Sequence, residues 1–486
     1  MRTRVIIIML IAFAKFSSYA QTGLYVPQLA AFDAAMTNLL STYNVPGGQM
    51  ALTYHGRLVY NRGFGYADVA AQTLVQPNSL FRIASVSKPI TGVAIMKLFE
   101  QGQINLDAKV FGATGILNDA IYQNILDPLA TDITVRQLLH HEGGWDSNLS
   151  GDPMFDSYNI ATVMGVTPPA SSVDVVRYML ANKMLDFTPG TQSVYSNFGF
   201  CVLGRVIEKI TGQTYTDYVT TNVLNPAGIY DMQQGHNLLS GQIPNEVQYY
   251  DYPGAPSAYS VYNNISTVPW QYGGFNLEAM DAHGGWIASC EDLCKFLVAI
   301  DRFTTKPDIL LPATIDTFIK PGVDPNYACG INVNTNNNWW HLGSLPGTCA
   351  EIIRAGNQQV NWVILVNSRT ANSGTIFNTI DNMLWSNLGS VSNWPTNDLF
   401  TGINENELDH LITVFPNPSN LDVTIESPAK FKSFSIIDVT GKVIYNSDVN
   451  DDHVKISVEN YDDGIYFVRV TNEDHSAIQK LIVQHK

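Results

Sequence analysis

The pattern of apolar and polar residues divides the chain into two regions of different periodicity. Between residue 26 and about residue 388, helical and strand-like patterns are mixed, whereas only strand-like alternation follows after about residue 408. The first region opens with apolar residues at spacings of three and four, which predict a helix: Leu29, Phe32, Met36, Leu39 and Leu40. The next segment, "GGQMALTYHGRLVYNRGFGYAD", has two strand-like runs around His55-Gly56 and predicts a hairpin.

The end of the first region also predicts strands. Four runs, "YACGINV", "NWWHLGS", "CAEIIRAG" and "VNWVILVNS", are separated by short polar breaks, a spacing typical of an antiparallel meander. Helical runs and loops rich in Gly and Pro fill the middle. A sheet assembled from both ends of a region, with helices inserted between them, belongs to the α+β class.

The second region has a different character. Residues 389–407, "GSVSNWPTNDLFTGINENE", have no period and many turn formers, and we interpret them as a linker. In residues 408–486 the runs "LDVTIES", "FKSFSIID", "HVKISVE" and "GIYFVRV" alternate apolar and polar residues. They predict a small all-β domain with the architecture of a sandwich. Because this domain contains no nucleophile with a base, we expect it to be non-catalytic.

The first residues have the pattern of an export signal. Arg2 and Arg4 precede an apolar run over residues 5–14 that is too short to span a bilayer, and Ser18-Tyr19-Ala20 is a small-x-small ending. We therefore expect a cleaved secretory signal over residues 1–20. No later stretch is long and apolar enough for a transmembrane helix, so we expect no stable membrane insertion.

Charge and cysteine usage narrow the function. The 486 residues carry 43 Asp and Glu against 27 Lys and Arg, a net charge of −16. This balance argues against nucleic acid and against anionic membranes as partners. The five cysteines have no zinc-ligand spacing, and we expect neither a metal nor a cofactor. Cys290 and Cys294 fit a buried helix face, whereas Cys329 and Cys349 lie in neighbouring predicted strands and could form a disulfide.

The stretch "FRIASVSKPIT" carries the first candidate for chemistry, because Ser85 stands three residues before Lys88. One interpretation is structural: a serine before an apolar run is a good helix N-cap, and Pro89 fits the first turn. The other is chemical. Residues three apart share one helix face, a serine needs a base to become a nucleophile, and burial can lower a lysine's pKa.

Two further stretches supply partners for this pair. "PGTQSVYSNFG" places Tyr195 and Asn197 before a predicted helix from about Phe198 to Ile210, and a loop tyrosine can act in proton transfer. "WWHLGSLPG" places His341 and Gly343 on a strand-like run, where a glycine lets a substrate backbone approach the strand edge.

The three motifs S-x-x-K, Y-S-N and H-x-G, in this order and with "TVRQLLHHEGG" and "GGWIASCEDLCKFL" around them, carry a resemblance. Residues 26–388 resemble the serine hydrolases of the class C β-lactamase and penicillin-binding-protein superfamily. The resemblance implies, for residues 21–388, a β-lactamase/transpeptidase-like antiparallel sheet flanked by helices, with a helical subdomain. Its substrates would be small esters, amides or peptides.

The resemblance also implies roles for individual residues. Ser85 would be the acylated nucleophile, and Lys88 and Tyr195 would move its proton, in an order that the sequence leaves open. Asn197 would orient Lys88 and the substrate. The backbone N–H groups of Ser85 and Ser344 would form the oxyanion hole.

One departure from the family pattern affects the substrate. Lactam-cleaving members usually begin the third motif with lysine, where this chain has His341. A histidine is mostly neutral at pH 7 and would bind a carboxylate less strongly. Members with H-x-G include esterases and D-amino-acid peptidases or amidases, so we expect an esterase or peptidase. The alternatives are a true β-lactamase or DD-carboxypeptidase, a His341 that only caps the site, and an inert secreted binding or scaffold protein.

Other conspicuous residues are expected to be structural. His140 and His141 fall in a stretch that resembles the family's L-L-x-H-x-x-G motif, which supports the site from behind, and His283 is interpreted as a loop residue. Three tryptophans fit either a cleft wall or the core: Trp145, Trp339 and Trp340.

The C-terminal domain has a resemblance of its own. The runs "VFPNPSN", "SIIDVTGKVIY", "GIYFVRV" and "QKLIVQHK" resemble the C-terminal sorting domain of type IX secretion cargo. This resemblance implies the type IX machinery as a partner, and export through the periplasm to the cell surface or the medium. The alternative is an adhesive or carbohydrate-binding sandwich.

Overall fold

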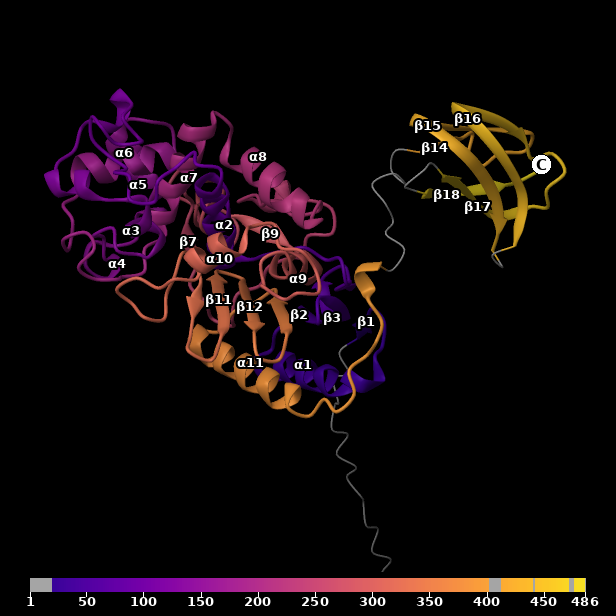
Figure 1. The fold of residues 1–486 in the computed structure, drawn as a ribbon, viewed down its shortest axis with the longest axis horizontal. Coiled ribbons are helices and arrows are strands. Elements are labelled where there is room, and N and C mark those ends of the chain that lie inside the picture. Colours follow the sequence, from indigo (N-terminus) through magenta and orange to yellow (C-terminus); the bar gives the residue numbers. More distant parts are fainter. Residues whose placement is uncertain (1–19, 402–411, 440–441, 472–475, 486) are drawn as a thin grey trace, which may run out of the picture. The chain divides into compact units, whose positions relative to one another are not determined.

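The computed structural model describes residues 20–401, 412–439, 442–471 and 476–485 (Figure 1). The predicted signal over residues 1–20 lies outside the described residues except for Ala20. The chain divides into two compact units, the first ending at Leu399 and the second beginning at Phe400. No helix within the described ranges is long and apolar enough to cross a membrane.

An eight-stranded antiparallel sheet forms the centre of the first unit. Its order is β1-β3-β2-β13-β12-β11-β10, with β4 paired to β3. The strands are β1 (Gln21–Thr22), β2 (Gly47–Tyr54), β3 (Arg57–Asp68), β4 (Thr73–Leu74), β10 (Asn332–Val333), β11 (Asn338–Leu345), β12 (Thr348–Ala355) and β13 (Val360–Val366). β2 pairs with β13, so the predicted assembly of one sheet from both ends of the region is confirmed.

The predicted hairpin and meander are both present, with one difference. β2 and β3 are joined at His55-Gly56, and β10 to β13 follow one another across the sheet. The run "YACGINV" gives only the two residues of β10, because the backbone turns at Gly330, which has a φ of 87°. Such a left-handed conformation suits glycine and ends the extended segment before it.

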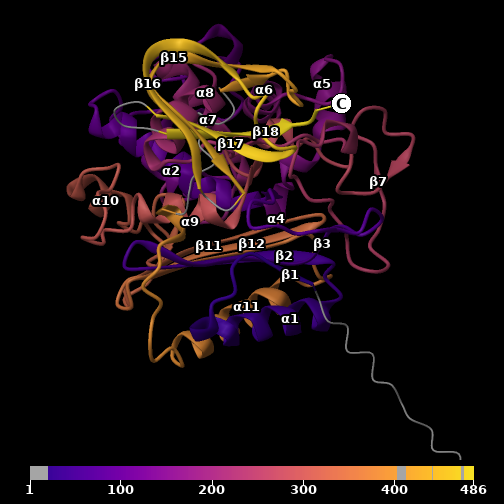
Figure 2. The ribbon, with the colours of Figure 1, turned by 90° about the vertical axis from the view of Figure 1, so that its right-hand side faces the viewer.

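Helices cover both faces of this sheet (Figure 2). α1 (Ala30–Tyr43) and α11 (Ser373–Leu388) pack side by side on one face, and α9 (Cys290–Val298) packs on β2 and β13 from the other. The helix predicted from the apolar spacing after Leu29 is α1, whose buried residues join Trp362 of β13 and Ile380 of α11 in one hydrophobic core. This burial is the main favourable term that fixes the layers.

The predicted helical region lies, in the sequence, between the strands at the two ends of the first unit. Its helices, with α10 further on, are α2 (Ser87–Glu100), α3 (Val135–Leu139), α4 (Ser147–Ser150), α5 (Ser157–Met164), α6 (Ser172–Asn182), α7 (Asn197–Thr211), α8 (Tyr215–Val219) and α10 (Pro312–Phe318). The small sheets are β5 (Phe81–Arg82), β9 (Trp286–Ala288) and β6 (Gln233–Gln234), and β7 (Ala258–Tyr259) with β8 (Thr267–Val268).

All five cysteines are buried free thiols. Cys290 and Cys294 lie on α9, on the buried face that the sequence predicts. The expectation that Cys329 and Cys349 pair is wrong. Cys329 lies before β10, with its Sγ 3.4 Å from Nε2 of His140. Cys349 lies on β12 in the core beneath α1 and α11, so the two thiols belong to different environments.

The second unit is all-β, as predicted. Its strands are β14 (Thr413–Phe415), β15 (Asp422–Asp438), β16 (Val443–Ser457), β17 (Gly464–Thr471) and β18 (Ser476–Val483). They hydrogen-bond into one five-stranded sheet, in which the long β15 pairs with β14, β16 and β17. Val423, Ile436 and Leu481 belong to a core of its own.

Because each unit has its own core, the first should fold without the second. We expect a chain that ends at Leu399 to keep the first unit's thermal transition, with a Tm within about 2 °C of the corresponding transition in the full chain. Differential scanning calorimetry of both chains provides the measurement. A broad transition, or a much lower Tm in the shortened chain, would contradict the independence of the two units.

Candidate active site

Ser85 occupies a strained turn directly before α2. It lies in a 3-10 turn over Ala84–Val86, and Ala84 has a φ of 48°, a left-handed conformation that is uncommon for a residue with a side chain. The N-cap of α2 is Val86 and makes no side-chain capping bond. The interpretation of Ser85 as a helix cap is therefore wrong, because its hydroxyl is engaged elsewhere. Strain of this kind is often found where a reactive side chain is held in place.

Lys88 is fully buried beneath Ser85. Its Nζ donates to Ser85 Oγ at 3.0 Å, to Asn197 Oδ1 at 2.8 Å and to the His283 carbonyl at 3.1 Å. These three acceptors match the three donors of an ammonium group. Burial lowers the pKa of Lys88 well below its usual value, and the charge of Asp152 only partly opposes the shift. At neutral pH a much larger fraction of this amine is therefore in the neutral form than in an exposed lysine.

Tyr195 approaches the same hydroxyl from the other side. Its OH donates to Ser85 Oγ at 2.7 Å, and Nζ of Lys88 lies 4.7 Å from the centre of its ring. The residue as a whole is 42% exposed, although its hydroxyl points inward at Ser85. Desolvation of this hydroxyl raises the pKa of Tyr195, so the phenol keeps its proton at neutral pH.

Asn197 is oriented by a residue that sequence reasoning missed. Its Nδ2 donates to Asp152 Oδ2 at 2.7 Å, which leaves its Oδ1 facing Lys88. Asn197 begins α7, one residue after Ser196, whose hydroxyl caps the helix by accepting from the Gly199 N–H. Asp152 precedes Pro153 in a loop, and nothing in the sequence distinguishes it from a turn residue.

Gly343 lets the edge of the sheet pass beside Ser85. A Cβ at this position would lie 2.3 Å from the Ile83 carbonyl oxygen and 3.2 Å from the Ser85 backbone nitrogen. β10 pairs only with Trp339 and Trp340. Within the part of the chain that the structure describes, the outer edge of β11 from His341 to Leu345 therefore has no strand partner. Ser344 lies on this stretch and lines the same cleft as Ser85.

His341 is buried and uncharged. Its Nδ1 lies 2.7 Å from the Leu342 carbonyl oxygen, an acceptor, so Nδ1 carries the proton and Nε2 bears a lone pair. Nε2 is 3.5 Å from the Tyr327 hydroxyl. Burial and the nearby Lys88 lower the pKa of His341 to about 3. The side chain presents no positive charge to the cleft at neutral pH.

Two aromatic residues, His141 and Tyr327, support Tyr195 and Ser196 and also line the cleft. His141 Nδ1 accepts from the Ser196 N–H at 3.2 Å, its Nε2 lies 2.9 Å from the Tyr327 hydroxyl, and its ring centre is 4.5 Å from that of Tyr195. The L-L-x-H-x-x-G stretch predicts a structural role for His141, and its ring also lines the cleft beside Tyr195. Tyr327 has no signal in the sequence, and neither has the His283 carbonyl that holds Lys88.

The structure brings together all seven residues that the sequence singles out. Ser85, Lys88, Tyr195 and Asn197 are joined by the hydrogen bonds described above. His341, Gly343 and Ser344 form one wall of a cleft of about 480 Å³ that Ser85 and Tyr195 also line. Of the three tryptophans, Trp340 lines this cleft, whereas Trp145 and Trp339 are buried. The arrangement places the Ser85 hydroxyl between a buried amine and a neutral phenol.

Comparisons with known proteins find similar sequences for both units. A family model described as beta-lactamase matches residues 32–380, and one described as secretion system C-terminal sorting domain matches residues 413–484. Penicillin-binding protein 4* of Bacillus subtilis is 29% identical over 260 residues, 52% of each chain. Protein flp of Staphylococcus aureus is 28% identical over 200 residues, 40% of this chain and 36% of its own. The chain thus spans about a third to a half of the length of these relatives.

Solved structures show the same fold. D-amino acid amidase from Ochrobactrum anthropi superposes with a TM-score of 0.58 at 21% identity, covering 76% of this chain and 100% of its own. EstCE1, described as a hydrolase with promiscuous acyltransferase activity, gives a TM-score of 0.57 at 19% identity, covering 74% and 98%.

Gly343→Ala tests the contact between β11 and the turn that carries Ser85. Because the added methyl would meet backbone atoms, we expect it to lower the free energy of unfolding by about 1–3 kcal/mol. Gly389→Ala is the matched control: its φ is −65° and the nearest atoms lie 3.8 Å away, so a change below about 0.5 kcal/mol is expected. Urea unfolding of both variants gives the comparison, and equal effects would show that β11 does not press on the turn.

Proposed function

Since the chain belongs to the beta-lactamase family of serine hydrolases, we propose that it cleaves esters or amides, short D-amino-acid peptides among them, through a covalent acyl-enzyme on Ser85. The observation that carries this proposal is the position of Ser85 Oγ, within hydrogen-bond distance of both Lys88 Nζ and the Tyr195 hydroxyl. A serine is activated when an adjacent group takes its proton.

In the proposed mechanism, Lys88 is the base and Tyr195 the acid. The opposite pKa shifts of the two groups support this division. The Ser85 proton moves to the neutral Lys88 amine as Oγ bonds to the substrate carbonyl carbon. Tyr195 then protonates the departing oxygen or nitrogen, and the proton on Lys88 returns to the tyrosinate. Water repeats the sequence on the acyl-enzyme and releases the acid.

The negative charge that develops on the carbonyl oxygen needs donors. We assign this role to the backbone N–H groups of Ser85 and Ser344. The close passage of β11 at Gly343 and the open edge of this strand support the assignment, because both bring main-chain donors to the nucleophile. Pre-oriented donors of this kind are usually the largest single contribution to acyl-transfer catalysis.

The state of His341 supports a preference for substrates without a carboxylate beside the reacting bond. It is neutral, its Nδ1–H is engaged by Leu342, and its Nε2 offers an acceptor. A charged lysine at this position would attract a carboxylate, as in the lactam-cleaving relatives. The amidase and the hydrolase among the similar structures support esters and amides as the substrate class.

The second unit directs the protein out of the cell. The match to a secretion system C-terminal sorting domain over residues 413–484 implies export to the surface or the medium by the type IX machinery. We propose that residues 389–407 are the linker and residues 408–486 the sorting domain. α11 ends at Leu388, immediately before the proposed linker. The segment over residues 1–20 would direct the first step of export.

Variants of the proposed catalytic residues test the mechanism. Ser85→Ala should abolish turnover. It should also abolish labelling by a fluorophosphonate probe, which is measured by mass spectrometry of the peptide that contains residue 85. Lys88→Ala and Tyr195→Phe should each lower kcat about a hundredfold or more, and their effects should not multiply in the double variant. Ser386→Ala, an exposed serine on α11, is the control. Near-normal turnover in Ser85→Ala would end the proposal, and absence of labelling in the folded wild type would favour an inert scaffold.

The substrate preference is tested by comparing kcat/KM for a short-chain nitrophenyl ester, a D-alanyl peptide and a chromogenic cephalosporin. We expect the ester or the peptide to lead, because His341 offers no cation to the cephalosporin carboxylate. His341→Lys should shift the ratio toward the carboxylate-bearing substrates, whereas the neutral His341→Gln should not. A lead for the cephalosporin in the wild type would identify a β-lactamase instead.

A further inference from the structure

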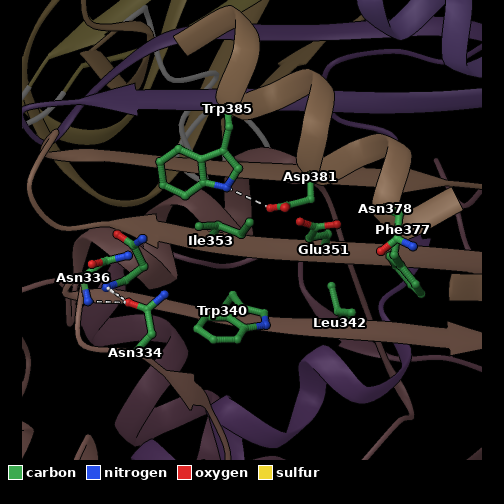
Figure 3. Close-up of a pocket in the computed structure, with 11 residues that line it drawn as sticks. Asn334, Asn336, Trp340, Leu342, Glu351, Ile353, Phe377, Asn378, Asp381 and Trp385 are labelled. Atoms are coloured by element: carbon green, nitrogen blue, oxygen red, sulfur yellow. Dashed lines mark hydrogen bonds between the residues drawn. The ribbon is translucent and has the colours of Figure 1, made fainter. Parts of the chain in front are cut away.

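A second groove lies between α11 and the sheet (Figure 3). Its volume is about 420 Å³. Trp340 and Leu342 of β11 stand opposite Ile353 and Glu351 of β12 in the strand register, and these residues form its floor. The groove and the catalytic cleft share three lining residues: Trp340, Leu342 and Phe377. The two spaces are therefore neighbours around the edge of the sheet.

Two buried acceptors in this groove have no donor. Glu351 is 1% exposed, and its Oε2 has no hydrogen-bond partner among the described residues. Asn338 is 9% exposed, and its Oδ1 also has no hydrogen-bond partner among the described residues. Buried polar atoms are nearly always paired, and leaving one unpaired costs its full desolvation energy. An ionised carboxylate oxygen and an amide oxygen both accept hydrogen bonds, so each of these atoms would be satisfied by a donor.

The charge around the groove favours a cationic donor. Figure 3 shows the carboxyl groups of Glu351 and Asp381 turned toward one another, and Asp381 Oδ1 accepts from Trp385 Nε1 at 2.8 Å. Burial and the Asp381 charge raise the pKa of Glu351 well above its usual value, because nothing compensates a negative charge there. No lysine or arginine is among the residues that line the groove. A bound cation would supply the positive charge that is missing beside the two carboxyl groups.

The walls favour a cation with an apolar part. Trp340 and Trp385 come from facing elements, β11 and α11, and Figure 3 shows Trp385 lying above Ile353. The faces of tryptophan rings attract ammonium groups and bury their carbon substituents. Inorganic cations would leave this aromatic surface unused, whereas an alkylammonium or arylammonium group would cover it.

We propose that this groove binds an organic ammonium group, which donates hydrogen bonds to Glu351 and Asp381 and packs its apolar part between Trp340 and Trp385. The site lies beyond the proposed acyl-transfer chemistry and uses none of its catalytic residues. The ammonium belongs either to the far end of a substrate that extends from the catalytic cleft or to a separate amine.

The first experiment measures binding of benzylammonium to the full chain by calorimetry, with benzyl alcohol as the uncharged analogue. The wild type should bind the cation at least about tenfold more tightly than the alcohol, and Glu351→Gln should remove that difference. Asp381→Asn, on the exposed side of α11, should weaken binding without disturbing the fold, and it keeps the test decisive if Glu351→Gln does not fold.

The control variant is Asp324→Asn, an acidic residue that lines the catalytic cleft but not this groove. It should leave benzylammonium binding unchanged. The site is overturned if the cation and the alcohol bind equally, if Glu351→Gln and Asp381→Asn bind as the wild type does, or if Asp324→Asn alone weakens binding. Labelling of Ser85 is unaffected by any of these outcomes, so this proposal can fail while the proposed hydrolysis stands.

The second experiment distinguishes the two sources of the ammonium. It compares kcat/KM for two esters of equal length whose far ends carry an ammonium or a hydroxyl group. A preference for the ammonium ester that disappears in Glu351→Gln identifies a substrate-borne cation. Equal rates for the two esters, with benzylammonium still bound in the first experiment, identify a separate amine.

Discussion

The burial of the Lys88 amine is the constraint on which the rest of the site depends. An amine removed from water must either lose its proton or find a hydrogen-bond acceptor for every N–H. Lys88 has acceptors on three segments that are far apart in the sequence: the turn at Ser85, the start of α7 at Asn197, and the loop at His283. Folding must therefore bring these segments together around one nitrogen.

The same burial links stability to chemistry. A solvent-exposed lysine would be tolerated more easily by the fold, but it would hold its proton too tightly to serve as a base. The enclosed environment destabilises the charged form of the amine and so lowers the pKa of Lys88. The proposed mechanism uses this lowered pKa. Tyr195 is affected in the opposite sense by the same desolvation, because its charged form is the deprotonated one. One enclosed space thus produces an amine that readily gives up its proton and a phenol that retains it.

The sequence reveals the framework of the fold and the candidate reactive residues more readily than the residues that support them. The periods that produce α1, the β2–β3 hairpin and the meander are local, and S-x-x-K, Y-S-N and H-x-G are visible as motifs. Asp152, Tyr327 and the His283 carbonyl act through contacts across the fold, and none of them stands in a distinctive pattern. The expected Cys329–Cys349 disulfide is absent for a related reason. Two strand-like runs that are close in the sequence do not reveal which way each side chain faces. The capping role of Ser85 fails because a tertiary contact outweighs a local preference.

The five buried thiols bear on the route that the chain takes out of the cell. With every cysteine reduced and enclosed in the core, the folded first unit does not depend on the redox state of its surroundings. Its fold contains no disulfide that a reducing environment could break. Any vulnerability falls before folding is complete, when the same thiols are exposed to oxidants and can cross-link wrongly. Burial of the thiols on folding would protect these cysteines in the way that correct pairing protects those of disulfide-bonded secreted proteins.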